Sequence, residues 1–277
     1  MESILTEEDF VKRAFLVLSL ALVTSAASAQ TRSVFTEDLT WMEVRDAMTA
    51  GKTSAIIYAG GTEQNGPHMA LVKHNAIARY VAGQIAEKLG NALVYPIMPF
   101  SPAGDPSEKT GHARFPGTVS VSSEVFLGVM RQEALAAIAG GFKNVFLMGD
   151  HGGGQTELRL AAESLDADWK PKGVRVFYVA DVQGKATQQT NGYLAERKIP
   201  GGGHAGVAET SQVMFLAQTQ KQSWIRSDKL TAAKGLPEPS TGINGDPSPA
   251  SVDMGRVFID YKVNAAVEQI KKLIAER

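Results

Sequence analysis

The alternation of short apolar runs with longer helical patterns constrains the fold of this chain more than any other sequence feature. Runs rich in Val, Ile, Tyr and Phe are predicted to be buried strands, at 54–60, 92–100, 144–150 and 174–182. Helical patterns are predicted at 74–90, 122–142, 154–169 and 252–276. Strands that alternate with helices pair in parallel, and helices cover both faces of the sheet. The chain is therefore predicted to be α/β, a three-layer α/β/α sandwich with a mostly parallel sheet.

Residues 1–29 are predicted to be an export signal rather than part of the fold. Lys12 and Arg13 precede a 16-residue run of apolar or small residues that ends in an Ala-x-Ala cleavage site. This run is shorter than the ~20 residues of a membrane-spanning helix, so no membrane attachment is expected after cleavage. The acidic segment before Lys12 is unusual, and a start codon upstream of the true one would explain it. The mature protein would be one domain, residues 30–277, that is periplasmic or secreted.

The composition of the mature chain excludes several classes of protein. The leader contains two of the 28 basic and four of the 29 acidic residues, which leaves 26 against 25. This balance gives no reason to expect nucleic acid or an anionic membrane as a partner. The chain has no cysteine, which excludes thiolate metal sites and cysteine nucleophiles. A serine hydrolase is excluded because no G-x-S-x-G elbow occurs.

All the histidines of the chain lie in segments rich in Gly or Pro, or at the boundaries of predicted elements. They are His68, His74, His112, His151 and His204. Ligands of an open parallel sheet bind beyond the carboxyl ends of its strands, where most of these histidines fall. A single histidine is more often a structural side chain, but the set together favours a site. Imidazole and carboxylate ligands without thiolate suit Zn²⁺, Mn²⁺ or a similar divalent ion.

Two of the candidate segments follow predicted strands. The stretch "GGTEQNGPHMALVKH" (60–74) is either a metal cradle or an ordinary polar turn. In "MGDHGGGQ" (148–155), His151 would be a metal ligand, and Asp150 would be its neighbour or an orienting group. A Gly-rich turn before a helix is common and would also suit a phosphate. Neither segment identifies a site by itself.

Two further segments contain the remaining polar candidates. In "GGGHAGVAETS", His204 on a glycine loop would act as an acid or a base. With a helix beginning near Ala205, Glu209 would lie in the second turn and face the site, or it would only stabilise the helix N-terminus. In "GHARFPGTVS", His112 and Arg114 either line a pocket for a polar substrate or hold the loop in place.

In their order along the chain, the motifs resemble those of the creatininase (creatinine amidohydrolase) family. The resemblance runs from Leu39 to about Ile274 through "LTWMEVRDA", "GGTEQNGPHMAL", "HARFPGTVS", "GDHGGG", "GGGHAGVAETS" and "GDPSPASVDMG". It implies a three-layer α/β/α fold, usually oligomeric, that uses Zn²⁺ or Mn²⁺ to hydrolyse C–N bonds in cyclic or other small amides. The implied partners are a small-molecule substrate and further copies of the same chain.

The resemblance assigns roles only to residues that match the family's motifs. It implies that Glu63 and His151 bind metal. It also implies that His204 takes part in catalysis, and that Glu209 lies beside the metals as an orienting group or a ligand. His68 matches the second histidine of the first motif and is expected behind the ligands.

Two positions depart from the family's pattern and change the predicted metal centre. Asn65 stands where the family has a histidine ligand, and His74 stands where it has an aspartate that bridges two metals. Neutral imidazole does not normally bridge two cations, so the prediction is one ion, or one tight and one weak ion. Glu63, His74 and His151 would form a His₂Glu set with an open position for water. Glu209 and Asn65 would hold any second ion.

The predicted function is metal-dependent hydrolysis of a C–N bond in an amide, lactam, formamide or small peptide, by a metal-activated water. Zn²⁺ is the first choice of ion and Mn²⁺ the second. His204 would protonate the leaving nitrogen. The changed ligands also suit an exported protein that binds a metal or small ligand without catalysis. A hydrolase of a lactone or a C–C bond is the third alternative.

Overall fold

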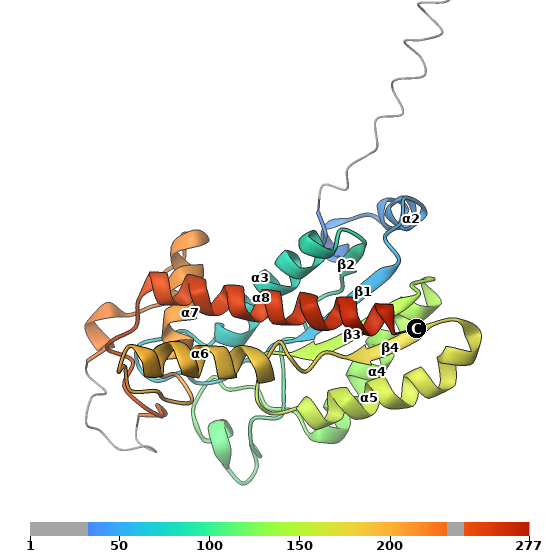
Figure 1. Cartoon of the computed structure of the whole chain (residues 1–277). Coiled ribbons are helices and arrows are strands. Elements are labelled where there is room, and N and C mark those ends of the chain that lie inside the picture. The colour runs from blue at the N-terminus through green and yellow to red at the C-terminus, as the bar shows by residue number, and fades with distance from the viewer. Residues whose placement is uncertain (1–32, 232–240, 277) are drawn as a thin grey trace, which may run out of the picture. The chain divides into compact units, whose positions relative to one another are not determined.

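Four parallel strands form the centre of the fold, in the order β2-β1-β3-β4 (Figure 1). The computed structural model describes residues 33–231 and 241–276, so the predicted export signal lies outside the described residues. The strands are β1 (Ser54–Ala59), β2 (Ala92–Val94), β3 (Asn144–Gly149) and β4 (Arg175–Tyr178). The α-helices are α2 (Trp41–Thr49), α3 (Lys73–Leu89), α4 (Ser123–Ala139), α5 (Gln155–Trp169), α6 (Gly184–Glu196), α7 (Val207–Thr219) and α8 (Val252–Ala275). The 3-10 helices are η1 (Thr36–Asp38), η2 (Gly111–Arg114), η3 (Lys170–Lys172) and η4 (Ser227–Lys229).

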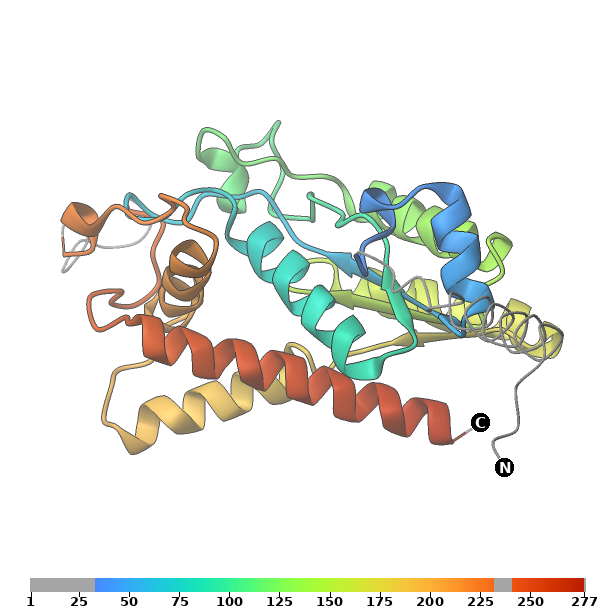
Figure 2. The ribbon, with the colours of Figure 1, turned by 90° about the horizontal axis from the view of Figure 1, so that it is seen from above.

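The sheet is buried on both faces, which explains why its strands are continuous apolar runs rather than alternating patterns. In β1, Ile56 and Tyr58 belong to a core that includes residues of α3, α7 and α8. Ala55 and Ile57 point the other way, into a second core that includes residues of α4 and α5. Figure 2 shows α3 and α8 side by side, and these two helices are in contact. The predicted three-layer α/β/α sandwich with a parallel sheet is confirmed.

Two of the strands are shorter than the apolar runs that predicted them. The run 92–100 contains Pro96 and Pro99, which lack the N–H that a ladder requires, so the continuous ladder with β1 covers only Ala92–Val94, and Met98 pairs with Ala59 as a single bridge. The last run pairs with β3 only over Arg175–Tyr178. Beyond these pairs the chain continues as loops that reach the edge of the sheet where the candidate residues lie.

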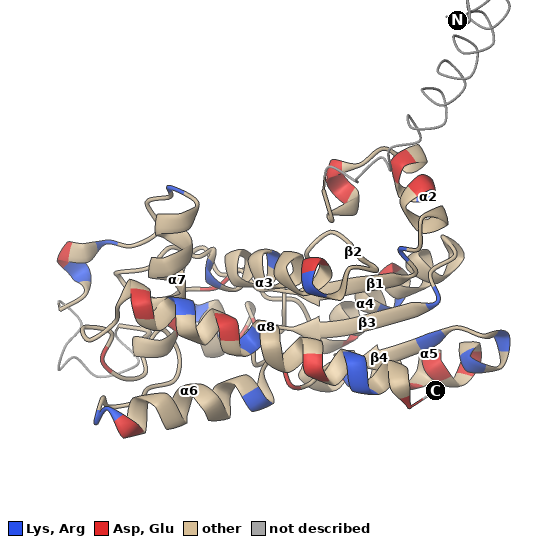
Figure 3. Cartoon of the chain, turned by 45° about the horizontal axis from the view of Figure 1, so that its top comes forward, with Lys and Arg blue, Asp and Glu red and all other residues tan. Residues whose placement is uncertain are grey.

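Charged residues of both signs are interspersed along α8, and α6 has charged residues near its two ends (Figure 3). Lys185 of α6 and Glu268 of α8, for example, form an exposed ion pair at 2.5 Å. Within the described ranges, no helix has both the length and the apolar character that a membrane span requires.

Gly255 allows α8 to pack closely against α7, and a side chain at this position is expected to destabilise the protein. A Cβ there would lie 1.9 Å from the carbonyl oxygen of Ser211 and 2.9 Å from Cβ of Phe215. Gly255→Ala should therefore lower the free energy of unfolding by about 1–3 kcal/mol, measured by urea denaturation. Gly128→Ala on α4 is the matched control, because among the described residues no atom beyond its chain neighbours and its own helix backbone lies within 4 Å of the Cβ position. Equal stability of the two variants would contradict this close contact.

Candidate active site

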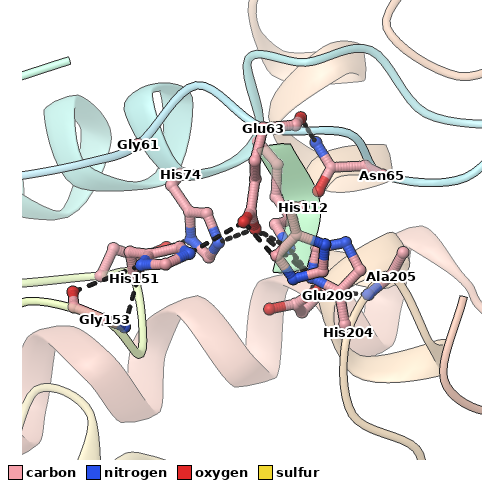
Figure 4. Close-up of polar contacts among 12 residues, drawn as sticks. Gly61, Glu63, Asn65, His74, His112, His151, Gly153, His204, Ala205 and Glu209 are labelled. Atoms are coloured by element: carbon pink, nitrogen blue, oxygen red, sulfur yellow. Dashed lines mark hydrogen bonds and ion pairs between the residues drawn. The ribbon is translucent and has the colours of Figure 1, made fainter. Parts of the chain in front are cut away.

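The carboxyl ends of β1 and β3 bring candidate residues together at one edge of the sheet. Glu63 follows the last residue of β1 by four positions, and Asp150 and His151 directly follow β3. His74 lies in the first turn of α3, which follows β1 along the chain. Figure 4 shows the His74 and His151 side chains directed at the Glu63 carboxylate. The position of the site agrees with the rule for parallel sheets.

Glu63, His74 and His151 form a buried group whose ligand atoms converge. Oε1 of Glu63 lies 2.8 Å from Nε2 of His74, and Oε2 lies 2.8 Å from Nε2 of His151. The three residues are 1%, 4% and 8% exposed, and their ligand atoms lie within 4.8 Å of one another. A carboxylate and two imidazoles with an open fourth position form the donor set of many catalytic zinc sites. These residues therefore fit a divalent ion.

A second carboxylate orients His74 from behind. Nδ1 of His74 donates a hydrogen bond to Oδ2 of Asp150 at 2.6 Å, which directs Nε2 toward Glu63. The other oxygen of Asp150 forms an ion pair with Nζ of Lys262 on α8 at 2.8 Å. The sequence predicted Asp150 as a neighbour of His151 or an orienting group, and in the structure its carboxylate contacts His74. Lys262 was not identified from the sequence, because it lies 112 residues away along the chain.

The charges of this group favour an ionised Glu63. Burial opposes ionisation, but hydrogen bonds from His151 and His74 and the charge of Lys73 hold the pKa of Glu63 far below its ordinary value. Burial and Lys73 also oppose protonation of His74. Hydrogen bonds to Asp150 and Glu63 outweigh both effects and raise the pKa of His74. A negative charge is therefore maintained at the point where the two imidazoles meet.

Lys73 is a fully buried residue of the site that was not identified from the sequence. Its Nζ lies 2.5 Å from Oε2 of Glu209, 3.3 Å from Oε1 of Glu63, and 3.3 Å from Nδ1 of His204. The side chain is 0% exposed. A cation in the first turn of a helix opposes the helix dipole, and a lysine is rarely buried without a partner. Lys73 could have been identified from its position at the start of a predicted helix, directly after an apolar stretch.

The Glu209 carboxylate is held by Lys73 and by the backbone. Its Oε2 accepts hydrogen bonds from Nζ of Lys73 at 2.5 Å and from the Ala205 amide at 2.6 Å. The helix begins at Val207, two residues later than predicted, so Glu209 lies in the first turn rather than the second. Burial opposes ionisation, but Lys73 and nearby imidazoles lower the pKa of Glu209 to about 2. Glu209 is thus an ionised group fixed beside the site.

His204 stacks on His112, with ring centroids 4.0 Å apart. Nδ1 of His204 lies 3.3 Å from Oε1 of Glu63 and from Nζ of Lys73, and Nε2 lies 2.8 Å from the Gln64 carbonyl oxygen. With Lys73 as the donor to Nδ1, Nε2 carries the proton and donates to this carbonyl. Burial and the charge of Lys73 lower the pKa of His204 to about 4. The ring is therefore neutral near pH 7.

Glu63, His112 and His204 form a second group with ligand atoms within 4.8 Å of one another. Nε2 of His112 lies 3.7 Å from Oε2 of Glu63, and Nε2 of Gln64 lies 2.8 Å from Nδ1 of His112. Both histidines of this group are partly exposed, unlike those of the buried group. Glu63 therefore stands between two sets of imidazoles (Figure 4).

Asn65, His68 and Arg114 lie outside both groups. Nδ2 of Asn65 donates hydrogen bonds to the backbone carbonyl oxygens of Glu63 and Ala70, at 2.9 and 3.0 Å. These bonds fix the side-chain amide against its own loop. His68 is fully buried and its Nε2 lies 2.9 Å from the hydroxyl oxygen of Thr210. The Arg114 guanidinium is 4.9 Å from the ring centroid of Phe115. The His68 ring therefore contacts Thr210 of α7, and its place behind the ligands stays a prediction.

A cavity of about 480 Å³ contains the reactive groups, and its lining is mainly polar side chains and glycines. Gly153 is required there, because a Cβ would lie 2.1 Å from the carbonyl oxygen of Pro102. Such a lining suits a small polar group. A larger apolar groove of about 1030 Å³ lies between α2 and α4, but none of these reactive groups lines it.

Glu209 is expected to make the protein sensitive to acid. Its folded pKa of about 2 lies below the ordinary 4.5, so its ionised form stabilises the native state fully above pH 4.5. This contribution is lost as the pH falls through that range toward 2. Glu209→Gln should therefore lower Tm most near neutral pH, and the difference from wild type should shrink toward pH 3. The measurement is thermal unfolding with a chelator present, and a constant difference between pH 7 and pH 3 would contradict the assignment.

Together, the fold and the site define an α/β protein with a histidine–carboxylate centre at the ends of parallel strands. The sequence model of the creatininase family, described as creatinine amidohydrolase, matches residues 37–270. The chain belongs to the creatininase family.

Its relatives include two hydrolases. A mycofactocin precursor peptide peptidase of Mycobacterium tuberculosis (strain CDC 1551 / Oshkosh) is 27% identical over 245 residues, which cover 79% of this chain and 85% of that protein. The creatinine amidohydrolase of Pseudomonas putida is 28% identical over 120 residues, which cover 43% and 45%. A solved creatinine amidohydrolase (creatininase) matches with a TM-score of 0.69 at 22% identity, over 87% of this chain and 98% of that one. The structural match confirms the creatininase-like fold.

Proposed function

We propose that this protein is a metal-dependent hydrolase of an amide C–N bond in a small polar molecule or short peptide. The observation that carries this proposal is the convergence of Glu63, His74 and His151 on one point of a polar cavity. His204 and Glu209 line the same cavity. The names of the two relatives, a peptidase and an amidohydrolase, support a C–N bond as the target.

Glu63, His74 and His151 would hold the ion, with Zn²⁺ as the first choice and Mn²⁺ as the second. When bound, such an ion polarises a substrate carbonyl and lowers the pKa of a water toward ~7. Solved creatininases described as a Zn-Zn type and as an Mn form support these two metals. Asp150 keeps the His74 imidazole in the tautomer that presents Nε2 to the site.

His204 would move the proton. Its ring is neutral near pH 7, because burial and Lys73 lower its pKa to about 4. Nδ1 faces Glu63 and is the atom that would accept a proton from the attacking water and later donate it to the leaving nitrogen. Glu209 bonds to the Ala205 amide and to Lys73, and so fixes the loop that carries His204. We assign Glu209 this orienting role rather than a ligand role.

Metal analysis of the purified chain and of His74→Ala tests the proposal first. The wild type is expected to contain about one Zn²⁺ or Mn²⁺ per chain, and the variant should lose it with one of its three ligands. Turnover is then measured on amides, lactams, formamides, short peptides and a lactone, before and after chelation. Activity that survives complete removal of the ion would contradict metal dependence.

The same experiment separates the enzyme from its main alternative. Asn65 and His74 depart from the family's ligands, and this observation favours a protein that binds a metal or a small ligand without catalysis. A tightly bound ion with no turnover on any amide, lactam, formamide or peptide would support that second function.

A further inference from the structure

Lys73 occupies the space between two carboxylates that would otherwise attract a metal ion. An ammonium has three N–H donors. Three acceptors surround Nζ, namely Glu209 at 2.5 Å, Glu63 at 3.3 Å and Nδ1 of His204 at 3.3 Å. The side chain is completely buried, so water does not replace any of these partners. The ammonium is therefore held at one position by the groups it neutralises.

Both candidate metal groups contain Glu63, whose Oε1 lies 3.3 Å from Nζ of Lys73, so they differ only in the charge next to their histidines. Behind His74, in the buried group, is the Asp150 carboxylate, although Lys262 also pairs with Asp150. In the second group, His204 has the Lys73 ammonium directly against its Nδ1. An ion held by this nitrogen would have to displace the hydrogen bond from Lys73, and it would then face a like charge that water does not screen.

We propose that Lys73 is a built-in cation that confines metal binding to Glu63, His74 and His151. By the same contacts it keeps the paired rings of His112 and His204 without metal. This inference rests on the proposed function, because it assumes that the buried group holds an ion. Lys73 is then a positioning residue, which acts through Glu209 and through the hydrogen bond that it donates to Nδ1 of His204, and this bond must give way before Nδ1 takes up a proton.

The charge of Lys73 also reaches the other groups of the cavity. Burial lowers the pKa of His204, and the charge of Lys73 is the next cause that lowers it. Burial raises the pKa of Glu209, and the charge of Lys73 is the main cause that lowers it. Burial lowers the pKa of His112 and the charge of Glu63 raises it. The charge of Lys73 is the next cause, and the pKa of His112 is lowered overall. The ammonium thus favours neutral imidazoles and ionised carboxylates on this side of the site.

Lys73→Met removes the charge and keeps a side chain of similar length. We expect calorimetric titration with Zn²⁺ and elemental analysis to give about one ion per wild-type chain and about two per Lys73→Met chain. Lys262→Met is the matched control, because it removes a mostly buried lysine behind His74. It should stay at about one ion, bound some 10–100-fold more weakly. A gain of an ion is not a result that general structural damage produces.

The outcomes separate this inference from the proposed function. A single ion in folded Lys73→Met would overturn the role of Lys73 and leave metal-dependent hydrolysis intact. Two ions in the wild type would also overturn it, because the second group would then bind metal beside the ammonium. No ion in the wild type would overturn both proposals.

If circular dichroism shows that Lys73→Met does not fold, His112→Ala tests whether the second group binds metal. It changes a partly exposed ring of the second group and leaves Lys73 in place. We expect one ion with Kd within about twofold of wild type, since His112 would not be a ligand. Loss of an ion, or a Kd weakened by ~10-fold or more, would show metal at the second group and overturn the inference.

Discussion

Replacement of Glu63 by glutamine is expected to abolish metal uptake and to lower turnover by on the order of 10⁴-fold. Glu63 supplies both oxygens that face His74 and His151, at 2.8 Å each. An amide offers one oxygen and no charge, so it cannot bind a cation as a carboxylate does. The measurements are elemental analysis and kcat on the best substrate found. Metal content equal to that of wild type would contradict the central position of Glu63.

The same substitution should also destabilise the folded protein. Lys73 would lose one of its two carboxylate partners inside a fully buried site, and breaking such a pair costs about 3–5 kcal/mol. Because Glu209 still pairs with Lys73, the loss should lie near the lower value. Glu163→Gln is the control, since it removes an exposed carboxylate that pairs with Arg159. That control should change stability by less than about 1 kcal/mol in urea denaturation.

His204→Ala is expected to lower kcat by roughly 10²–10⁴-fold while the metal content stays unchanged. The ring touches the site through Nδ1, 3.3 Å from Glu63, and its lowered pKa makes it a base near neutral pH. It is not a member of the buried group that is proposed to hold the ion. The loss should therefore appear in the chemical step rather than in metal binding.

Three measurements check the assignment of His204. They are kcat and KM, elemental analysis of the same sample, and turnover with added imidazole. Partial recovery by imidazole is expected, because the free base would enter the space that the side chain leaves. Full activity in His204→Ala would exclude the proton-transfer role. Loss of the ion from this variant would place His204 among the ligands instead.

Much of the fold followed from local patterns. Apolar runs such as Ser54–Ala59 predicted strands buried on both faces, and the helical patterns between them required parallel pairing. The edge where ligands bind then followed from the topology alone, so Glu63 and His151 could be placed near each other. The ends of the strands could not be predicted as well. The ladder with β1 is interrupted after Val94, where Pro96 has no N–H to donate, and it returns only as a single bridge at Met98.

The resemblance to the creatininase family implied Glu63 and His151 as ligands, and His74 entered as a departure from its pattern, but the surroundings of these residues were not predicted. Chemical type alone indicates that Glu63, His74 and His151 can bind a divalent ion. Residue type does not show whether a side-chain amide or carboxylate points into the proposed metal site, because its hydrogen-bond partners set its direction. Asn65 illustrates this, because its amide nitrogen donates to backbone carbonyls within five residues of it.

The sequence by itself determined the family, the layered α/β architecture and the edge of the sheet that contains the site. Only the tertiary structure placed the Lys73 ammonium against Glu209 and His204, and Lys262 against Asp150. These pairs join segments more than 100 residues apart, so no spacing rule links them. Packing decides which charges meet in a buried space, because each ionised group removed from water must find its partner there.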